Sequence, residues 1–222
     1  SLLWDANSTA QSKKYLRQTL WQLQNILPDQ SDQDDNPLLL IEPDWIRVNP
    51  EADLWLDVAK FEEAYKNAHG FQGWQLNADT VHALEMAENL FSDDLLIGWY
   101  QDWTLFERER FQNMFLSMLD KLMAYCEAHG KYETGITYGM RILNIDMARE
   151  RTHQNLMRLH YLSGDRTAAL RQYKRCEKAL MDELGVEPAR HTQELYETFK
   201  ADNELNALQP SDDTKPLREP QQ

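Results

Sequence analysis

The sequence has few cysteines, a shortage of basic residues and no long apolar run, and each shortage excludes a class of protein. Only 2 of its 222 residues are cysteines, too few for a disulfide-stapled scaffold or a zinc site of paired cysteines. The 23 basic residues are outnumbered by 37 acidic ones, so the surface as a whole disfavours non-specific wrapping of nucleic acid. Any contact with nucleic acid must come from a local basic patch.

Membrane, export and catalytic signals are also missing. No apolar segment reaches the length of a membrane span, and the first residues lack the basic-then-apolar plan of a signal peptide. We therefore expect a cytoplasmic protein without membrane contact. The sequence contains no Gly-rich phosphate loop and no His-Glu-x-x-His motif, so we expect no enzyme activity, no cofactor and no metal. His153 and His160 share one predicted helix, where packed or solvated histidines are commoner than a shared metal.

The sequence does contain two copies of a predicted helical hairpin between residues 118 and 184. Gly130 and Gly164 are 34 residues apart, the period of the tetratricopeptide repeat, a helix-turn-helix unit. Neither hairpin can bury its apolar face alone, so neighbouring hairpins must stack on it. The pattern predicts an interaction scaffold more readily than a catalytic one. At this offset small or apolar residues recur as Leu122 with Leu156, Met123 with Met157, Gly135 with Ala169, and Ile142 with Cys176.

The two cysteines lie in separate predicted repeat helices. Cys126 and Cys176 both fall at apolar positions of these helices, and a reactive thiol would need an exposed, electropositive setting instead. We predict buried free thiols, which suit a reducing cytosol.

Residues 10–27 predict an amphipathic helix, with a leucine stripe at 16, 20, 23 and 27 on one face. Gln pairs with adenine, and Arg or Lys with guanine or phosphate, so the opposite face could read a major groove. The alternative is an ordinary solvated face. Trp21 also projects outward, and we expect it to meet the next hairpin or a neighbouring domain. The polar face carries Gln11, Lys14, Gln18, Gln22 and Asn25, flanked by Arg17, with Lys13 near the helix start.

Residues 38–41 and 45–48 predict a β-hairpin, because two short apolar runs flank the turn Glu42-Pro43-Asp44. A helix followed by such a hairpin suits the back half of a winged helix. The turn at the wing tip is acidic and would repel phosphates. Arg47 is the only cation in the hairpin.

Further helices are predicted at residues 56–69, from Asn77 or Asp79 to about 91, at 105–129 and at 192–205. Between the second and third of these, residues 92–103 carry many bulky side chains and predict a loop pinned into the core. The last helix should cover the final repeat with Leu195, Phe199 and Tyr196. Residues 209–222 contain three prolines and mixed charge, which predicts a disordered tail or linker.

Several signatures occur in a fixed order along the chain. They are Asp53-Leu54-Trp55-Leu56-Asp57-Val58, Asp94-Leu95-Leu96, Asp102-Trp103, Glu107-Arg108-Glu109-Arg110, Leu156-Met157-Arg158-Leu159-His160-Tyr161, Gly164-Asp165-Arg166, Ala169-Leu170-Arg171-Gln172-Tyr173 and Leu184-Gly185-Val186-Glu187-Pro188. Together they resemble the bacterial transcriptional activator domain of the antibiotic regulatory protein (SARP) type of transcription regulator. The resemblance covers residues 53 to about 200 and is strongest in the closing part.

Upstream, Leu2-Leu3-Trp4, the helix at 10–27 and the hairpin at 38–48 are similar to the second half of that family's winged helix. The resemblance implies that the helix reads DNA and that the hairpin is the wing. The leading strands and first helix of the winged domain do not appear, so we expect coding sequence upstream of Ser1 to supply them. The implied DNA-binding residues are Lys13, Lys14, Arg17, Gln18, Gln22 and Arg47.

These observations predict a mainly α protein, with tetratricopeptide-like helical repeats preceded by a partial winged helix with a β-hairpin. The predicted divisions are a partial winged helix-turn-helix DNA-binding domain at 1–50, a helical repeat activator domain at 51–208 and a tail at 209–222. The predicted function is a DNA-binding transcription regulator whose repeats mediate homodimerisation or contact RNA polymerase or another protein. The alternative is a repeat adaptor that binds proteins and not DNA, which the net charge of −14 favours.

Overall fold

The computed structural model describes residues 9–26, 37–42, 45–93 and 95–207. Within these ranges the protein is mainly α-helical, with one short β-hairpin near the N-terminus. Leu27, the wing-tip residues Pro43 and Asp44, the segment Leu2-Leu3-Trp4 and the predicted tail at 209–222 lie outside the described residues.

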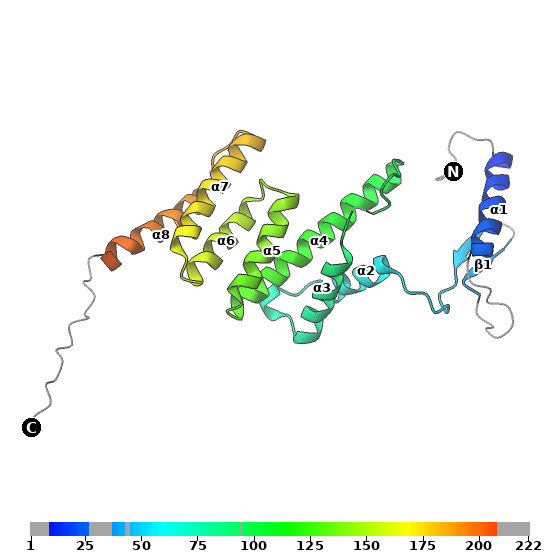
Figure 1. The fold of residues 1–222 in the computed structure, drawn as a ribbon, viewed down its shortest axis with the longest axis horizontal. Coiled ribbons are helices and arrows are strands. Elements are labelled where there is room, and N and C mark those ends of the chain that lie inside the picture. The colour runs from blue at the N-terminus through cyan, green and yellow to red at the C-terminus, as the bar shows by residue number, and fades with distance from the viewer. Residues whose placement is uncertain (1–8, 27–36, 43–44, 94, 208–222) are drawn as a thin grey trace, which may run out of the picture.

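The elements follow one another along an elongated molecule (Figure 1). An N-terminal unit, formed by α1 and the hairpin β1–β2, lies at one end, and α8 lies toward the other. Helices α2 to α7 lie between them, and we call α2 to α8 together the helical array. In chain order the elements are α1 Thr9–Ile26, β1 Leu39–Ile41, β2 Ile46–Val48, α2 Asp57–Ala68, η1 Gly73–Gln75, α3 Ala78–Leu90, α4 Asp102–Ala128, α5 Tyr132–Ile145, α6 Glu150–Leu162, α7 Arg166–Leu184 and α8 Arg190–Ala207.

The two predicted helical hairpins are α4–α5 and α6–α7, and their turns have the same geometry. Gly130 has φ of 69° and Gly164 has φ of 86°, the left-handed conformation that glycine adopts without a Cβ clash. The next residue closes each turn on the preceding helix, with Lys131 N to Cys126 O and Asp165 N to His160 O both at 2.9 Å. The repeat predicted from a 34-residue offset is therefore present in the backbone.

Close helix contacts rest on small residues, as predicted for Gly135 and Ala169. A Cβ at Gly135 would lie 3.1 Å from the Cβ of Cys126 on α4, and Ala169 is fully buried. A further glycine, Gly139, is tighter still, because a Cβ there would lie 2.6 Å from Leu156 Cδ2. Helix α5 is thus held against α4 and α6 through backbone where a side chain would not fit.

The paired positions of the two repeats form the interior. Leu122, Met123, Leu156 and Met157 are all fully buried, as are Ile142 and Cys176. Burial of such side chains contributes about 1.5–3 kcal/mol each relative to leaving them in water. The stacking of hairpins that the sequence requires is therefore what buries the repeat positions.

Helix α8 covers the end of the array as predicted. Phe199 stacks on Tyr161 of α6 with ring centroids 4.2 Å apart, and Tyr196 stacks on Tyr173 of α7 at the same distance. Leu195 packs against the same cluster. The start of α8 is held by Glu150 of α6, whose carboxylate accepts a hydrogen bond from Ala189 N at 2.7 Å.

The predicted helix boundaries lie within a few residues of the observed ones. Asn77 caps α3 by accepting a hydrogen bond from Thr80 N at 2.8 Å, as expected. Helix α4 begins at Asp102 instead of residue 105, since Thr104 and Leu105 already bond to the carbonyl of Gln101. None of the helices in the described ranges has both the length and the apolar character needed to cross a bilayer.

The α3–α4 connector, residues 91–101, corrects one prediction. Its bulky side chains were expected to pin it into the core, but Ile97 is 64% exposed and Tyr100 is 80% exposed. Of the connector residues that the structure describes, only Leu95 and Phe91 pack against the core cluster. Arg108 of α4 holds the connector by its backbone instead. The guanidinium donates to the carbonyls of Leu95 at 2.6 Å and Trp99 at 2.9 Å.

Candidate nucleic-acid interface and protein-binding surfaces

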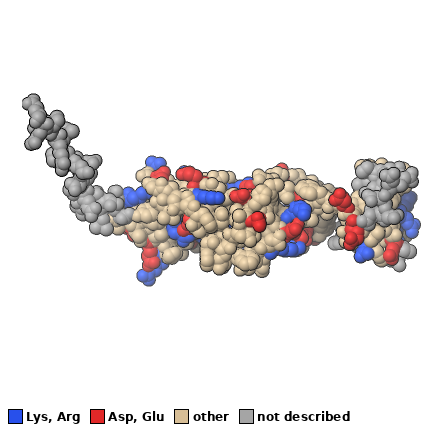
Figure 2. Space-filling view, turned by 90° about the horizontal axis from the view of Figure 1, so that it is seen from below, with Lys and Arg blue, Asp and Glu red and all other residues tan. Residues whose placement is uncertain are grey.

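Helix α1 presents the cations and amides that the sequence assigns to DNA. Lys13, Lys14, Arg17, Gln18 and Gln22 are all exposed, and no acidic residue occurs in the helix. Lys and Arg side chains gather at the outer edge of the N-terminal unit, away from the helical array (Figure 2). The charge and exposure that contact with a phosphate backbone requires are therefore both present.

The apolar stripe of α1 corrects a second prediction. Of the leucines expected on a buried face, Leu20 is half-buried, while Leu16 and Leu23 are exposed. Trp21, which was expected to meet the next hairpin or a neighbouring domain, is 66% exposed. The periodicity of the leucines identifies a face that favours burial, but it does not show which element packs on that face. The described residues cover this face of α1 only in part.

The hairpin is antiparallel as predicted, with Leu39 opposite Val48 and Ile41 opposite Ile46. Arg47, the predicted wing contact, is exposed and lies over the Trp45 ring with its guanidinium carbon 4.9 Å from the ring centroid. Asn49 ends the hairpin, because its side-chain amide donates to Pro37 O at 2.8 Å. Arg47 therefore stands on an aromatic support at the edge of a two-stranded ribbon.

The five predicted DNA-binding residues of α1 fall into two groups. A groove of about 580 Å³ separates α1 from the hairpin, and Lys13 and Arg17 line it together with Glu42 and Trp45. Lys14, Gln18 and Gln22 do not line this groove. Lys13 and Arg17 are thus placed next to the wing, while the other three residues lie elsewhere on the helix.

Exposed apolar side chains mark a second surface, at the start of α4. Phe106 is 71% exposed, and Ile97, Trp99, Tyr100 and Leu105 are exposed in the neighbouring connector and first turn. Large apolar surfaces of this kind mark protein contacts in soluble proteins. We call these five residues the α4 apolar surface.

The Glu107 to Arg110 run lies in the first turns of α4, and its arginines have structural contacts. Arg110 binds Glu107 at 2.7 Å and Glu62 of α2 at 2.6 Å. Arg110 and Lys66 hold the pKa of the Glu62 carboxyl below its usual value, chiefly through the hydrogen bond from Arg110. Through Arg108, which binds the connector, and Arg110, which binds α2, this run ties two segments to α4.

The interior of the second repeat contains one polar group of interest. His153 is 1% exposed; its Nε2 donates to Met147 O at 2.9 Å, and Gln172 Nε2 donates to its Nδ1 at 2.8 Å. Burial lowers the pKa of His153 below its usual value, so the ring is a neutral connection between α6 and α7. Among the described residues, no group of histidine, cysteine or carboxylate side chains could hold a metal ion.

Both cysteines are buried free thiols, as predicted. Desolvation raises the pKa of Cys126 to about 11 and that of Cys176 to about 12. A thiolate is the reactive form, so these side chains act as apolar core residues.

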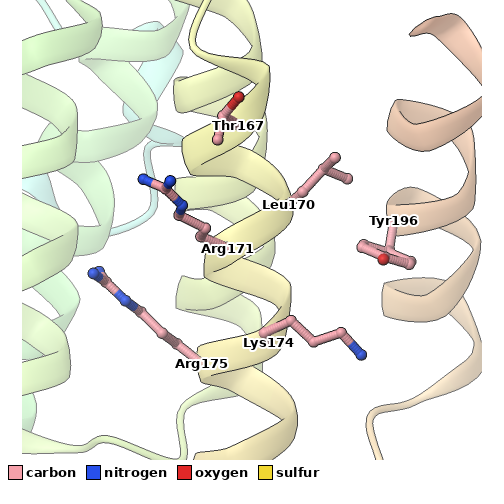
Figure 3. Close-up of a pocket in the computed structure, with 6 residues that line it drawn as sticks. All are labelled: Thr167, Leu170, Arg171, Lys174, Arg175 and Tyr196. Atoms are coloured by element: carbon pink, nitrogen blue, oxygen red, sulfur yellow. The ribbon is translucent and has the colours of Figure 1, made fainter.

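Two grooves flank α7, and the sequence did not indicate either. One, of about 510 Å³, lies between α5 and α7 and has Met140 and Met147 on its walls with His153 at its base. The other, of about 480 Å³, lies between α7 and α8 and is shown in Figure 3. The sequence does contain one feature that could have indicated them: the cations at positions 171, 175 and 178 have the spacing of residues on one face of a helix.

Comparison with known proteins identifies a matching family and a similar solved structure. Residues 56–200 match the family described as the bacterial transcriptional activator domain. The chain is also similar to a solved structure of Mycobacterium tuberculosis EmbR, in complex with a low affinity phosphopeptide, with 18% identity and a TM-score of 0.57. The match covers 90% of this chain and 53% of the EmbR chain, so the chain spans about half the length of that protein. None of the curated proteins compared with the chain matches it.

Proposed function

Because the chain belongs to the family of the bacterial transcriptional activator domain, we propose that it acts as a transcription regulator, binding DNA through its N-terminal unit and proteins through its helical array. The single observation that carries the DNA-binding role is the acid-free helix α1 beside an antiparallel hairpin. Its exposed cations stand out in a protein whose net charge is −14.

DNA contact is assigned to six residues with two roles. Phosphate contacts position a protein, and base contacts specify the sequence. The amides of Gln18 and Gln22 have the donor and acceptor pair that reads adenine in the major groove. Lys13, Lys14, Arg17 and Arg47 supply the cations that bind phosphate or guanine.

The division of labour follows the chain. We assign DNA binding to residues 1–50 and protein contact to residues 51–208. The described strands are three residues long, and leucines of α1 are exposed. These features support completion of the winged domain by further sequence upstream of Ser1.

A gel-shift assay tests the DNA-binding role. The gene product, including any coding sequence upstream of Ser1, should shift its own promoter region, while a scrambled duplex of the same composition should shift only at much higher protein concentration. A shift that does not depend on sequence, or the absence of any shift, would contradict the proposal.

The protein-binding role has its support in the α4 apolar surface. An exposed cluster of aromatic and aliphatic side chains is the usual core of a protein interface. We propose that it mediates self-association or contact with the transcription machinery. Ile97→Ser combined with Phe106→Ser should reduce self-association in sedimentation equilibrium, or retention of RNA polymerase. A double change of exposed residues on α8, Arg190→Ser with Glu194→Ser, is the control.

The second candidate is a repeat adaptor that binds proteins and never DNA. Its support is the net charge of −14 and the acidic residue Glu42 beside the cations of α1. In that case the gel shift fails while the helical array still binds its partner.

A further inference from the structure

Helix α7 carries a cluster of exposed cations, although the protein as a whole is acidic. Arg171, Lys174, Arg175 and Lys178 are all exposed and lie within little more than two helical turns. Lys174 is paired with Glu177 at 2.9 Å. Among the described residues, Arg171, Arg175 and Lys178 form no ion pair, so their charge is available to a ligand.

The cations border the groove between α7 and α8. Figure 3 shows Arg171 and Arg175 projecting from one side of α7, while Leu170 and Lys174 project from the other side toward Tyr196 of α8. The ring of Tyr196 is fixed, because it stacks on Tyr173 with centroids 4.2 Å apart. A groove with Leu170 and the fixed Tyr196 ring on its wall, and with Lys174 Nζ 5.7 Å from that ring's centroid, therefore runs beside a row of exposed arginines.

We propose that this α7–α8 groove binds an extended acidic segment of a partner protein, in which acidic and apolar residues alternate. Successive side chains of an extended peptide point to opposite sides, and alternate residues are about 6.6 Å apart. Arg171 and Arg175 are one helical turn apart, about 6 Å along the axis. Two alternate carboxylates can therefore meet the two arginines, while the intervening apolar side chain enters the groove beside Leu170 and Tyr196.

The groove limits the length of the ligand. Asp182 and Glu183 follow the cationic row toward the end of α7 and are exposed, so a third and fourth carboxylate further along would be repelled. Guanidinium groups bind carboxylates through paired hydrogen bonds. The segment expected is therefore short, with two acidic residues.

The cations of α7 could also bind DNA, but the shape of the groove beside them favours a peptide. A duplex presents phosphates but no apolar side chain for the wall of Leu170 and Tyr196. Long-range repulsion by the net charge of −14 opposes a duplex more than a short peptide. The inference rests on the proposed protein-binding role of the helical array, and it does not depend on DNA binding by α1.

The test is fluorescence anisotropy with the full chain and a labelled peptide, Gly-Glu-Phe-Glu-Leu-Gly. Binding should weaken at least about tenfold when Arg171→Glu is combined with Arg175→Glu, since two carboxylate pairs are replaced by repulsion. The control, Arg151→Glu with Arg190→Glu, changes the net charge equally at exposed positions on α6 and α8. Circular dichroism melting curves establish that both double variants are folded.

Changes in the ligand test the apolar part without disturbing the protein. A peptide with serine in place of Phe and Leu should bind several-fold more weakly. The proposal is overturned if the peptide does not bind, if both double variants lose binding equally, or if the serine peptide binds as well. It is also overturned if a short random duplex competes more effectively than unlabelled peptide. Failure here, with self-association through the α4 apolar surface intact, would leave the proposed protein-binding role standing.

Discussion

Single residues decide how closely the helices of the array approach one another. Gly139 lies where a Cβ would be 2.6 Å from Leu156 Cδ2 and 3.0 Å from Met123 Sδ. Leu156 and Met123 are both fully buried, so neither can move toward solvent to make room.

Gly139→Ala should therefore destabilise the protein, although alanine is the better helix former. Overpacking costs about 1–3 kcal/mol, and the gain in helix propensity offsets about 1 kcal/mol of it. We expect a net loss of about 1 kcal/mol in urea unfolding. Gly135→Ala on the same helix is the control, because its nearest contacts would be 3.1 Å, and it should be the more stable variant. The reverse order would contradict the close approach at residue 139.

His153 makes stability depend on pH. Burial lowers the pKa of His153 in the folded protein, so the unfolded chain takes up the proton first. The stabilisation is present above the unfolded pKa of about 6.5 and is lost as the pH falls toward the lower folded pKa. Burial also lowers the pKa of His160, which adds to the effect with the same sign.

We expect the free energy of unfolding to be smaller at about pH 5.5 than at about pH 7.5. His153→Gln, which has no titratable group, should reduce this difference but leave the part due to His160. Urea unfolding at the two pH values measures it. An unchanged pH dependence in the variant would show that His153 does not carry the effect.

At the scale of elements, Arg108 fixes the α3–α4 connector. It donates to the carbonyls of Leu95 and Trp99, and Leu96 between them has φ of 53°, a conformation uncommon for leucine. The connector is therefore held by a side chain from α4 and not by burial of its own bulky residues.

Arg108→Ala should increase hydrogen exchange in residues 95–101 by roughly tenfold, since charge-assisted hydrogen bonds of about 1.5–3 kcal/mol hold the connector closed. Exchange in α5 to α7 should not change. Arg110→Ala, which removes partly exposed ion pairs from the same turn, is the control. Equal protection of the connector in both variants would contradict its assigned role.

The elements predicted well are those specified by local sequence. The cap at Asn77, the turns at Gly130 and Gly164, and the cover formed by Phe199 follow from periodicity and turn chemistry. The exposure of Trp21 and of the connector side chains could not be predicted from the sequence, because it depends on which other elements lie near them. The polar face of α1 could be read from spacing, whereas the α7–α8 groove exists only because α8 brings Tyr196 beside Leu170.

At the scale of the whole molecule, charge separates two kinds of contact. The protein carries a net charge of −14, yet α1 contains no acid and α7 presents a row of exposed cations. Acidic and basic side chains are interspersed over the face of the helical array in Figure 2. The basic residues of α1 and α7, and not the net negative charge of the protein, therefore determine which partners we propose.

Salt dependence tests how the whole regulator binds DNA. Lys14→Ala or Arg17→Ala in the complete gene product should weaken DNA binding and reduce the slope of log affinity against log salt by about 0.9 for each phosphate that the variant no longer binds. Filter binding at several salt concentrations measures the slope. Arg151→Ala on α6 should change neither quantity. If the slopes of all three variants equal that of the parent, Lys14 and Arg17 do not bind phosphate.

The matching turns at Gly130 and Gly164 make this architecture modular. Because each turn is closed by the same backbone bond and the two turns are 34 residues apart, one further hairpin could be inserted between α5 and α6 and leave the contacts of α8 with α6 and α7 intact. Evolution could thus lengthen or shorten the scaffold in whole units, shifting the distance between its two ends while each end keeps its chemistry.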